Sequence, residues 1–437
     1  MSDWDTDGLV AADKRYLWHP FTSMHDWCAP GHEPLILVEG HGAMLRDSRG
    51  REYIDGNSSI WTNIHGHNHP HINAAIRRQL DLVAHTSFLG FTNPPAIELA
   101  CSIVELFPPN TLSRVFYSDD GSTGIEVALR IAHQYWRLQG TGRHRFIAFK
   151  EAYHGDTAGA ASLGAAAMFQ NGAANWNFPA LTVDSVEELE ALSAQEAGQI
   201  AAVVIEPMVQ GAAGIKLWPP GTLTAVRGWC ARSGALLIAD EVLTGFGRTG
   251  KMFACQHENI TPDIMVLAKG LTGGYLPLAI TLITEQIFSV FSSLPDAENT
   301  LFYGHSYTGN ALACAAAKAS LEIFNQDHVL DDLSAKIETL RAELVSLREL
   351  PWVAQVRQCG FIVGVEVQAD VGWTDARHGG LGSAICLAAR QRGLLTRPIR
   401  NVIVLIPPYC ITHSQLRQAV LAIGEAIAEV CQETVPA

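Results

Sequence analysis

Short apolar runs alternate with longer amphipathic stretches between about residues 70 and 320. The runs are RVFYS (114–118), RFIAFK (145–150), AAVVIEP (201–207), ALLIAD (235–240) and IMVLAK (264–269). Most of them start roughly 30 residues apart, the length of a strand–helix unit, and stretches such as GIEVALRIAHQYWRL have helical periodicity. Because near-continuous apolar strands are typical of parallel sheets, we predict an α/β fold with a mainly parallel sheet covered by helices.

The two ends of the chain have a different pattern. PLILVEG and AMLRDSRGREYIDG predict short strands, the second a hairpin that turns at residues 48–50. DDLSAKIETLRAELVSLREL predicts a long exposed helix, FIVGVEV and VIVLIPP predict strands, and a last helix is expected from about residue 414. We therefore predict an N-terminal segment (1–65) packed with a small domain, a large domain (66–325) and a small C-terminal α+β domain (326–437).

Composition and charge exclude several classes of function. The 437 residues are 48% hydrophobic and 17% charged, as expected of a large globular protein. A net charge of −14 without a run of Lys or Arg argues against a nucleic-acid partner. No apolar run approaches the ~18 residues of a membrane span, and the acidic N-terminus does not resemble a signal peptide. Nine scattered cysteines predict reduced core thiols, so we expect a cytoplasmic protein.

Polar or ionisable residues follow each predicted strand of the large domain. They are Ser118-Asp119-Asp120, Lys150, Glu206, Asp240-Glu241 and Lys269. In open α/β sheets, ligands bind beyond the carboxyl ends of the strands. For any one of these residues taken alone, a strand that meets water at its end is the favoured explanation. Five such ends in succession favour one shared site.

Three of these ends carry particular chemistry. In YSDDGSTGIEVAL, the Gly121-Ser122 pair lies where a helix begins, so it is either an anion site or an ordinary helix cap. Lys269 ends an apolar strand and is followed by glycines; it is either a nucleophile whose pKa burial lowers or a side chain that extends to solvent. Asp240 also ends an apolar strand, where a carboxylate requires a positive partner.

Two further motifs suggest other functions. Residues 245–250 match Gly-x-Gly-x-x-Gly, but five residues separate Asp240 from Phe246 and no helix or suitably placed acid follows, so we interpret them as a loop and not as a nucleotide site. The three histidines of HGHNHP (65–70) could lie on one face of a strand-like piece. They have no accompanying acid or cysteine, and we predict no metal site.

Taken together, several segments resemble the class III aminotransferases that depend on pyridoxal phosphate. These segments are LLIADEVLTGFGRTG, VLAKGLTGGYLP, YHGDT (153–157), IEPMVQGAAG (205–214) and GHSYTGN (304–310). WHPFTSM (18–24), SSIWTNIHGHNHP (58–70) and LLTRPIRNVIVLIPPY (394–409) resemble the branch that converts 8-amino-7-oxononanoate to 7,8-diaminononanoate in biotin biosynthesis. The resemblance implies the aspartate-aminotransferase fold (fold type I) and a homodimer. The alternative is another class III aminotransferase for ω-amino acids or amines, or a related racemase.

The resemblance also implies a role for each matching residue. Lys269 would attach the pyridoxal phosphate and then move a proton as base and acid, with Asp240 at the pyridine nitrogen and Tyr153 against the ring. The other cofactor contacts would be Gly121, Ser122, Glu206 and the partner subunit's Ser306. The substrate contacts would be Phe21, Ile60, Trp61, Asp156, Gly304, Arg397 and Val404. Arg397 would bind the substrate carboxylate, for which a guanidinium is suited.

The chain departs from well-described members of that branch, which take the amino group from S-adenosylmethionine. Phe21 replaces a tyrosine, Ile60 a tryptophan, Ser306 a threonine, and Ile399 and Val404 replace Phe and Tyr. These changes remove aromatic surface, with which a sulfonium cation interacts favourably. The pattern is closer to the variant that uses lysine, and Asp156 could meet the ammonium of either donor. The donor is therefore S-adenosylmethionine or lysine, and the departures favour lysine.

Overall fold

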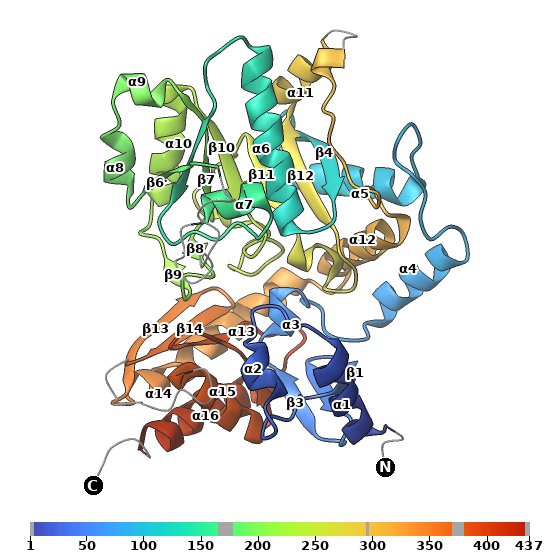
Figure 1. Ribbon diagram of the computed structural model, residues 1–437, viewed down its shortest axis with the longest axis vertical. Coiled ribbons are helices and arrows are strands. Elements are labelled where there is room, and N and C mark those ends of the chain that lie inside the picture. Colours follow the sequence, from blue (N-terminus) through green and yellow to red (C-terminus); the bar gives the residue numbers. More distant parts are fainter. Residues whose placement is uncertain (1–3, 165–177, 294–296, 369–379, 433–437) are drawn as a thin grey trace.

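The apolar runs form one seven-stranded sheet in the computed structural model, which describes residues 4–164, 178–293, 297–368 and 380–432 (Figure 1). In spatial order the strands are β4 (Leu112–Ser118), β12 (Ala279–Thr284), β11 (Ile264–Leu267), β10 (Leu236–Asp240), β7 (Ile200–Ile205), β5 (Arg145–Phe149) and β6 (Leu181–Val183). β10 pairs in parallel with β7 and β11, whereas β12 runs antiparallel to β11 and β4. The mainly parallel sheet is confirmed, although β6 and β12 are absent from the predicted set.

Both faces of this sheet are covered, because successive side chains of a strand point to opposite faces. In β7 every residue is buried; Val203 and Ile205 belong to one apolar core, and Ala202 and Val204 to another. One face packs against α6 (Gly121–Leu138), α7 (Ala158–Leu163) and α11 (Glu285–Ser292). The helices of the other face are α5 (Pro94–Val104), α8 (Val186–Glu190), α9 (Ala194–Ala197), α10 (Thr222–Ser233) and α12 (Ala311–Gln326).

A second, antiparallel sheet lies towards the C-terminus. Its strands, in spatial order, are β13 (Val353–Cys359), β14 (Ile362–Val367), β17 (Val402–Leu405) and β16 (Pro398–Ile399). The helices of this part are α13 (Val329–Glu343), α14 (Val345–Arg348), α15 (Leu381–Gln391) and α16 (His413–Gln432). The expected long exposed helix is wrong in two respects. It divides into α13 and α14, and α13 buries Leu333 and Leu340 because it packs between α12 and α16.

The N-terminal segment joins this C-terminal part. β1 (Leu37–His41), β2 (Met44–Asp47) and β3 (Glu52–Asp55) form the predicted hairpin and its extension, and β15 (Leu394–Leu395) pairs in parallel with β3. Figure 1 shows the blue N-terminal elements beside the red C-terminal helices. The remaining helices of the first hundred residues are α1 (Thr6–Tyr16), α2 (Met24–Cys28), α3 (Ser58–Trp61) and α4 (Pro70–Leu80). The domain limits stay a prediction.

Two smaller expectations concern membranes and thiols. Among the described residues, no helix is long and apolar enough to cross a bilayer. All cysteines are free, and most are buried in the core as expected. The prediction of core thiols is wrong for Cys28, Cys101 and Cys410, which are exposed.

Candidate active site

The carboxyl ends of the central strands converge on a cavity of about 810 Å³. Because parallel strands end at the same edge of a sheet, side chains far apart in the sequence line one space. The cavity is lined by these predicted site residues: Phe21, Ile60, Trp61, Gly121, Ser122, Tyr153, Glu206, Asp240, Lys269, Arg397, Ile399 and Val404. Four of the five predicted strand ends meet in it, but the expectation is wrong for Lys150, which does not line the cavity and pairs with Asp184.

At one end of the cavity, helix α6 begins at Gly121. The carboxylate of Asp120 accepts a hydrogen bond from the Thr123 N–H (2.9 Å), and the Thr123 hydroxyl accepts one from the Asp120 N–H (3.0 Å). This capping box fixes the first turn. A Cβ on Gly121 would lie 2.8 Å from a methyl of Val242, so only glycine fits there. The free N–H groups of this turn point into the space at the helix N-terminus, which is where helices bind anions.

Ser122 and Gly155 meet beside this turn. The Ser122 hydroxyl accepts a hydrogen bond from the Asp156 N–H at 3.2 Å. Gly155 has φ of 126°, and a Cβ on it would lie 2.3 Å from Ser122 Oγ. A glycine is therefore required for the loop after β5 to pass close to the helix. The first turn of α6 and this loop together form a cradle that suits a phosphate.

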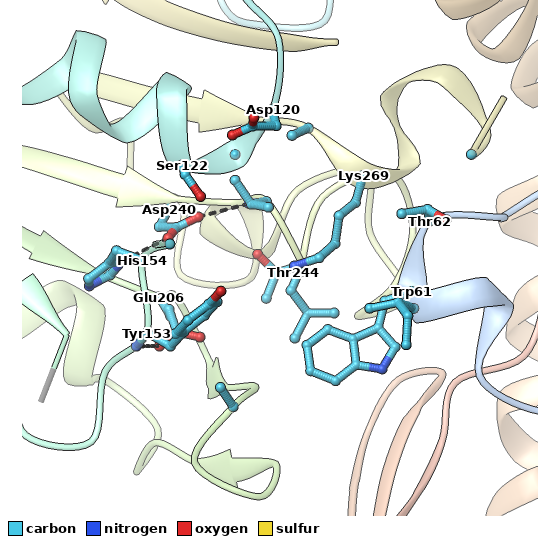
Figure 2. A pocket seen from close by; sticks show the side chains of 18 of the residues that line it. Trp61, Thr62, Asp120, Ser122, Tyr153, His154, Glu206, Asp240, Thr244 and Lys269 are labelled. Carbon is cyan, nitrogen blue, oxygen red and sulfur yellow. Dashed lines mark hydrogen bonds and ion pairs between the residues drawn. The ribbon is translucent and has the colours of Figure 1, made fainter. Parts of the chain in front are cut away.

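Lys269 lies on the opposite side of the cavity, two residues after β11. It has φ of 36° and begins a short 3₁₀ helix, Lys269–Thr272. Burial lowers the pKa of the Lys269 amine, and the positive charge of Arg248 acts in the same direction, whereas Asp240 and Glu206 oppose the change. Figure 2 shows the side chain extending into the cavity toward Trp61, whose ring centre is 5.1 Å from Nζ. An amine with a lowered pKa is a nucleophile for carbonyl carbons.

Asp240, the last residue of β10, pairs with a buried histidine. Its Oδ2 lies 2.7 Å from His154 Nδ1, and its Oδ1 accepts a hydrogen bond from the Val242 N–H at 3.1 Å. Burial alone would lower the pKa of His154, but the hydrogen bond and charge of Asp240 outweigh it and raise that pKa. The pair gives the Asp240 carboxylate a positive partner, as its burial requires. His154 is not among the predicted site residues, although it stands in the YHGDT motif.

Glu206 and Tyr153 form the wall beside this pair (Figure 2). Burial and, to a lesser extent, the charge of Asp240 raise the pKa of Glu206 to about 7 against the opposing effects of His154 and two backbone N–H groups. These N–H groups belong to Tyr153 (3.1 Å) and Gly211 (2.9 Å). The Tyr153 hydroxyl donates to Asp156 Oδ2 at 2.7 Å, and burial together with this bond raises the pKa of the phenol.

The remaining wall comes from the two ends of the chain. Phe21 and Ile60 contribute from the N-terminal segment, and Ile399 and Val404 from the C-terminal sheet. Val404 is buried, whereas the Phe21 and Ile60 side chains are 59% and 46% exposed, which leaves apolar surface at the mouth of the cavity. Arg397 is exposed at the same mouth and is available to a carboxylate. This wall suits a substrate with an apolar chain and a terminal anion.

Three predicted site residues do not line the cavity. Asp156 contacts two lining residues, Tyr153 and Ser122, through hydrogen bonds. Gly304 and Ser306 are exposed in the loop that follows residue 300, and the Ser306 carbonyl accepts a hydrogen bond from His85 (2.9 Å). The expectation that Ser306 serves the site of a partner subunit stays a prediction.

The two alternative motifs have different outcomes. Residues 245–250 form turns and not a helix, as expected of a loop. The strand-like piece expected for the HGHNHP motif is wrong: residues 65–70 form no strand beyond an isolated bridge of His67 with Gly42, and His65 and His67 have separate partners, Ser320 and Asp55. Within the described residues, no cluster of His, Cys, Asp and Glu is suited to a metal ion.

The donor set fits pyridoxal phosphate. A cradle that a Cβ at Gly121 or Gly155 would fill lies at one end, an amine of lowered pKa at the other, and a buried carboxylate between them. His154 Nε2 is buried and has no hydrogen-bond partner among the described residues, so the polar network on this wall is incomplete in the protein alone. Lys269, Asp240, Gly121 and Ser122 are the residues that would hold the cofactor.

Comparisons with known proteins show the family of this chain. The class III aminotransferase family matches residues 28–427. The adenosylmethionine-8-amino-7-oxononanoate aminotransferase of Geobacter sulfurreducens is 44% identical over 443 residues, which cover 95% of this chain and 96% of that protein. The enzyme with the same name from Nitratidesulfovibrio vulgaris is 44% identical, covering 98% of this chain and 83% of that protein.

Solved structures extend the likeness to the fold. The crystal structure of adenosylmethionine-8-amino-7-oxononanoate aminotransferase from Methanocaldococcus jannaschii has a TM-score of 0.92 at 39% identity, and covers 97% of this chain and 99% of that chain. An (S)-enantioselective omega-transaminase from Thermomicrobium roseum has a TM-score of 0.89 at 31% identity, with 98% and 100% covered. The predicted fold is thus confirmed, and the chain belongs to the class III aminotransferases.

Proposed function

We propose that this chain transfers an amino group to 8-amino-7-oxononanoate and forms 7,8-diaminononanoate in biotin biosynthesis. The observation that carries the proposal is the facing arrangement of Lys269 and the buried Asp240 in one cavity with a phosphate cradle. The names of the 44% identical relatives support the substrate. We further propose a cytoplasmic homodimer, in which Ser306 and Gly304 complete the partner subunit's site.

Lys269 has the central chemical role. Bound pyridoxal phosphate supplies an aldehyde for the amine and a ring that takes up electrons from the substrate. The Lys269 amine, whose pKa burial lowers, attacks a carbonyl carbon in its neutral form. The same amine would also move a proton at the carbon that loses or gains the amino group.

Asp240 and His154 form a charged pair across the cavity from the Lys269 amine. The Asp240 carboxylate keeps a pyridine nitrogen protonated, since it is buried and fixed by His154 and the Val242 N–H. Glu206 lies on the same wall, and its pKa of about 7 is close to the pH of the cytoplasm. Gly121 and Ser122 bind the phosphate through the N–H groups and the hydroxyl at the start of α6.

The substrate fits the wall from the two ends of the chain. The carboxylate of 8-amino-7-oxononanoate pairs with Arg397, and its methylene chain contacts Phe21, Ile60 and Val404. Asp156, held next to Tyr153, is the acid available to the ammonium of the donor. At the mouth of the cavity, this chain has less aromatic surface than the well-described members that use S-adenosylmethionine. Because a sulfonium interacts favourably with aromatic rings, this difference favours lysine as donor.

The experiment offers each donor separately to the purified protein with 8-amino-7-oxononanoate and measures diaminononanoate. We expect product with lysine, and less or none with S-adenosylmethionine. Product with S-adenosylmethionine alone would reverse the donor assignment. Failure with both, together with turnover of an ω-amino acid, would instead favour the omega-transaminase activity named for the 31% identical structure.

A second measurement tests Lys269. The holoenzyme is reduced with borohydride, and the attachment site of pyridoxal phosphate is mapped by mass spectrometry. In Lys269→Ala we expect no attached cofactor, an altered visible spectrum and no turnover. Lys150→Ala is the matched control, since Lys150 also ends a strand but is exposed and paired with Asp184. Covalent cofactor in Lys269→Ala would contradict the assignment.

A further inference from the structure

The turn between α1 and α2 carries Phe21 to the mouth of the cavity. Phe21 lines the cavity although its side chain is 59% exposed. Its φ of 51° lies in the left-handed region, which a bulky residue adopts only where its surroundings hold it. The Thr22 hydroxyl donates to the Pro20 carbonyl at 2.8 Å. This local bond supports the shape of the turn, but it does not fix the turn relative to the cavity.

One carboxylate joins both ends of this turn to helix α1. Asp13, in the last turn but one of α1, accepts a hydrogen bond from the Trp27 indole N–H at 2.7 Å through Oδ2. Its Oδ1 lies 2.9 Å from His19 Nε2. The Asp13 side chain is 11% exposed and that of His19 26%, so water screens these contacts less than it screens a surface pair. His19 precedes Phe21 and Trp27 follows it, and we call Asp13, His19 and Trp27 the clasp.

The two partners of Asp13 also contact each other. The ring centres of His19 and Trp27 are 4.2 Å apart, and those of Trp27 and His32 are 4.7 Å apart. These aromatic contacts help to keep the Trp27 N–H directed toward Asp13. Lys14, the next residue of α1, donates to the His32 carbonyl at 2.5 Å. Two neighbouring side chains of α1 therefore hold the chain on both sides of the turn.

We propose that Asp13 is a positioning residue for substrate binding, which holds Phe21 at the mouth of the cavity through His19 and Trp27. Asp13 does not line the cavity, so it acts on the substrate through the turn. The inference rests on the proposed function for the identity of the substrate. It predicts that loss of Asp13 changes KM more than kcat. A carboxylate that only stabilised the N-terminal segment would change Tm and leave KM as it is.

The test compares the holoenzymes of Asp13→Leu, Asp13→Asn and the wild type. The readouts are kcat and KM for 8-amino-7-oxononanoate with the donor that supports wild-type turnover, Tm, and the hydrogen–deuterium exchange of amides 17–27. Leucine has a similar size but accepts no hydrogen bond. In Asp13→Leu we expect KM to rise roughly 10-fold, which corresponds to half the burial of one apolar side chain. We expect little change in kcat and faster exchange in the turn.

Asp13→Asn is the conservative variant. Its amide oxygen can accept from the Trp27 N–H, and its amide nitrogen can donate to His19 in the other tautomer of the imidazole. We therefore expect Asp13→Asn to restore most of the wild-type KM and the slow exchange of the turn. A KM as high as that of Asp13→Leu would contradict the role of these two hydrogen bonds.

A double variant shows whether Asp13 acts through Phe21. If it does, Asp13→Leu combined with Phe21→Ala has the same KM as Phe21→Ala alone, because coupled residues are not additive. If the two increases in KM multiply, Asp13 acts by another route and the inference is overturned.

Asp7→Leu is the matched control. Asp7 is also a carboxylate of α1 that pairs with a distant residue, Arg49, at 2.9 Å. It is 88% exposed, and this partner lies outside the turn that carries Phe21. We expect the wild-type KM and wild-type exchange of amides 17–27. An increase in KM as large as that in Asp13→Leu would show that any change in α1 has this effect, and would contradict a specific role of Asp13.

The remaining outcomes also decide the inference. Wild-type KM in Asp13→Leu would overturn it, whatever the Tm. If Asp13→Leu does not fold, Trp27→Phe decides, because it keeps a ring and removes the N–H donor, and wild-type KM in that variant would overturn the inference. A wild-type enzyme inactive with 8-amino-7-oxononanoate would contradict the proposed function instead. The exchange of amides 17–27 does not depend on the substrate, and wild-type exchange in Asp13→Leu would then overturn the role of Asp13.

Discussion

Replacing Gly155 with alanine tests the phosphate cradle. The new Cβ would lie 2.3 Å from the Ser122 hydroxyl and 2.7 Å from the Ser122 Cα, well inside the 3.4 Å at which ordinary contact begins. Because one of these atoms belongs to the backbone of α6, rotation of the serine alone does not relieve the clash. The first turn of the helix must shift, and with it the N–H groups that would bind a phosphate.

The size of the effect follows from the contacts. One charge-assisted hydrogen bond contributes about 1.5–3 kcal/mol, so losing the Ser122 contact alone should raise the Kd for pyridoxal phosphate roughly 10- to 150-fold. The φ of 126° adds a strain of about 1–3 kcal/mol to the folded state. We therefore expect Gly155→Ala to lower both cofactor affinity and Tm.

The assay is a titration of cofactor-free protein with pyridoxal phosphate, followed by visible absorbance, with Tm measured in parallel. Gly50→Ala is the control, because Gly50 also has positive φ (84°) but has no atom within 4 Å of the place that a Cβ would take. It should lower Tm with little change in Kd. Wild-type Kd in Gly155→Ala would refute the assignment of Ser122 to the phosphate.

Two further predictions concern Glu206 and Arg397. Burial raises the folded pKa of Glu206 from 4.5 to about 7, so the wild type should lose about 3 kcal/mol of stability as pH rises through this window; Glu206→Gln should not, and parallel Tm curves for the two proteins from pH 4.5 to 8 would contradict the pKa. Arg397→Gln should raise KM for 8-amino-7-oxononanoate roughly 10- to 150-fold by removing a charge-assisted contact, with kcat little changed, and an unchanged KM in steady-state kinetics would place the carboxylate elsewhere.

The location of the site could be predicted because it depends on local patterns. Asp240 and Lys269 each follow a run of apolar residues, and parallel strands bring such ends to one edge. Gly121 and Ser122 stand where the amphipathic pattern of α6 begins. Each of these assignments needs only the residues on either side and the general geometry of an α/β sheet.

The other features of the site and of the fold depend on contacts between segments that are distant in the sequence. His154 pairs with a carboxylate 86 residues later, and its own neighbours do not indicate this. The left-handed turn that ends at Trp61 contains no glycine, so its backbone is set by Asp55 and Arg248 and not by local preference. The strand β12 lies between β4 and β11 although it follows both in sequence. Such features follow from the whole fold.

The pairing of the N-terminal segment with the C-terminal part has a consequence for biosynthesis. The Ser58 hydroxyl donates to the carbonyl of Ile406, 348 residues later, and β3 pairs with β15. At about 5–20 residues per second on the ribosome, the first strands have to wait on the order of 20–70 seconds for their partners. During this time the large sheet can already fold, while the aromatic N-terminal segment stays available to chaperones. Assembly of the cavity is therefore a late event that cannot precede the synthesis of residues 394–406.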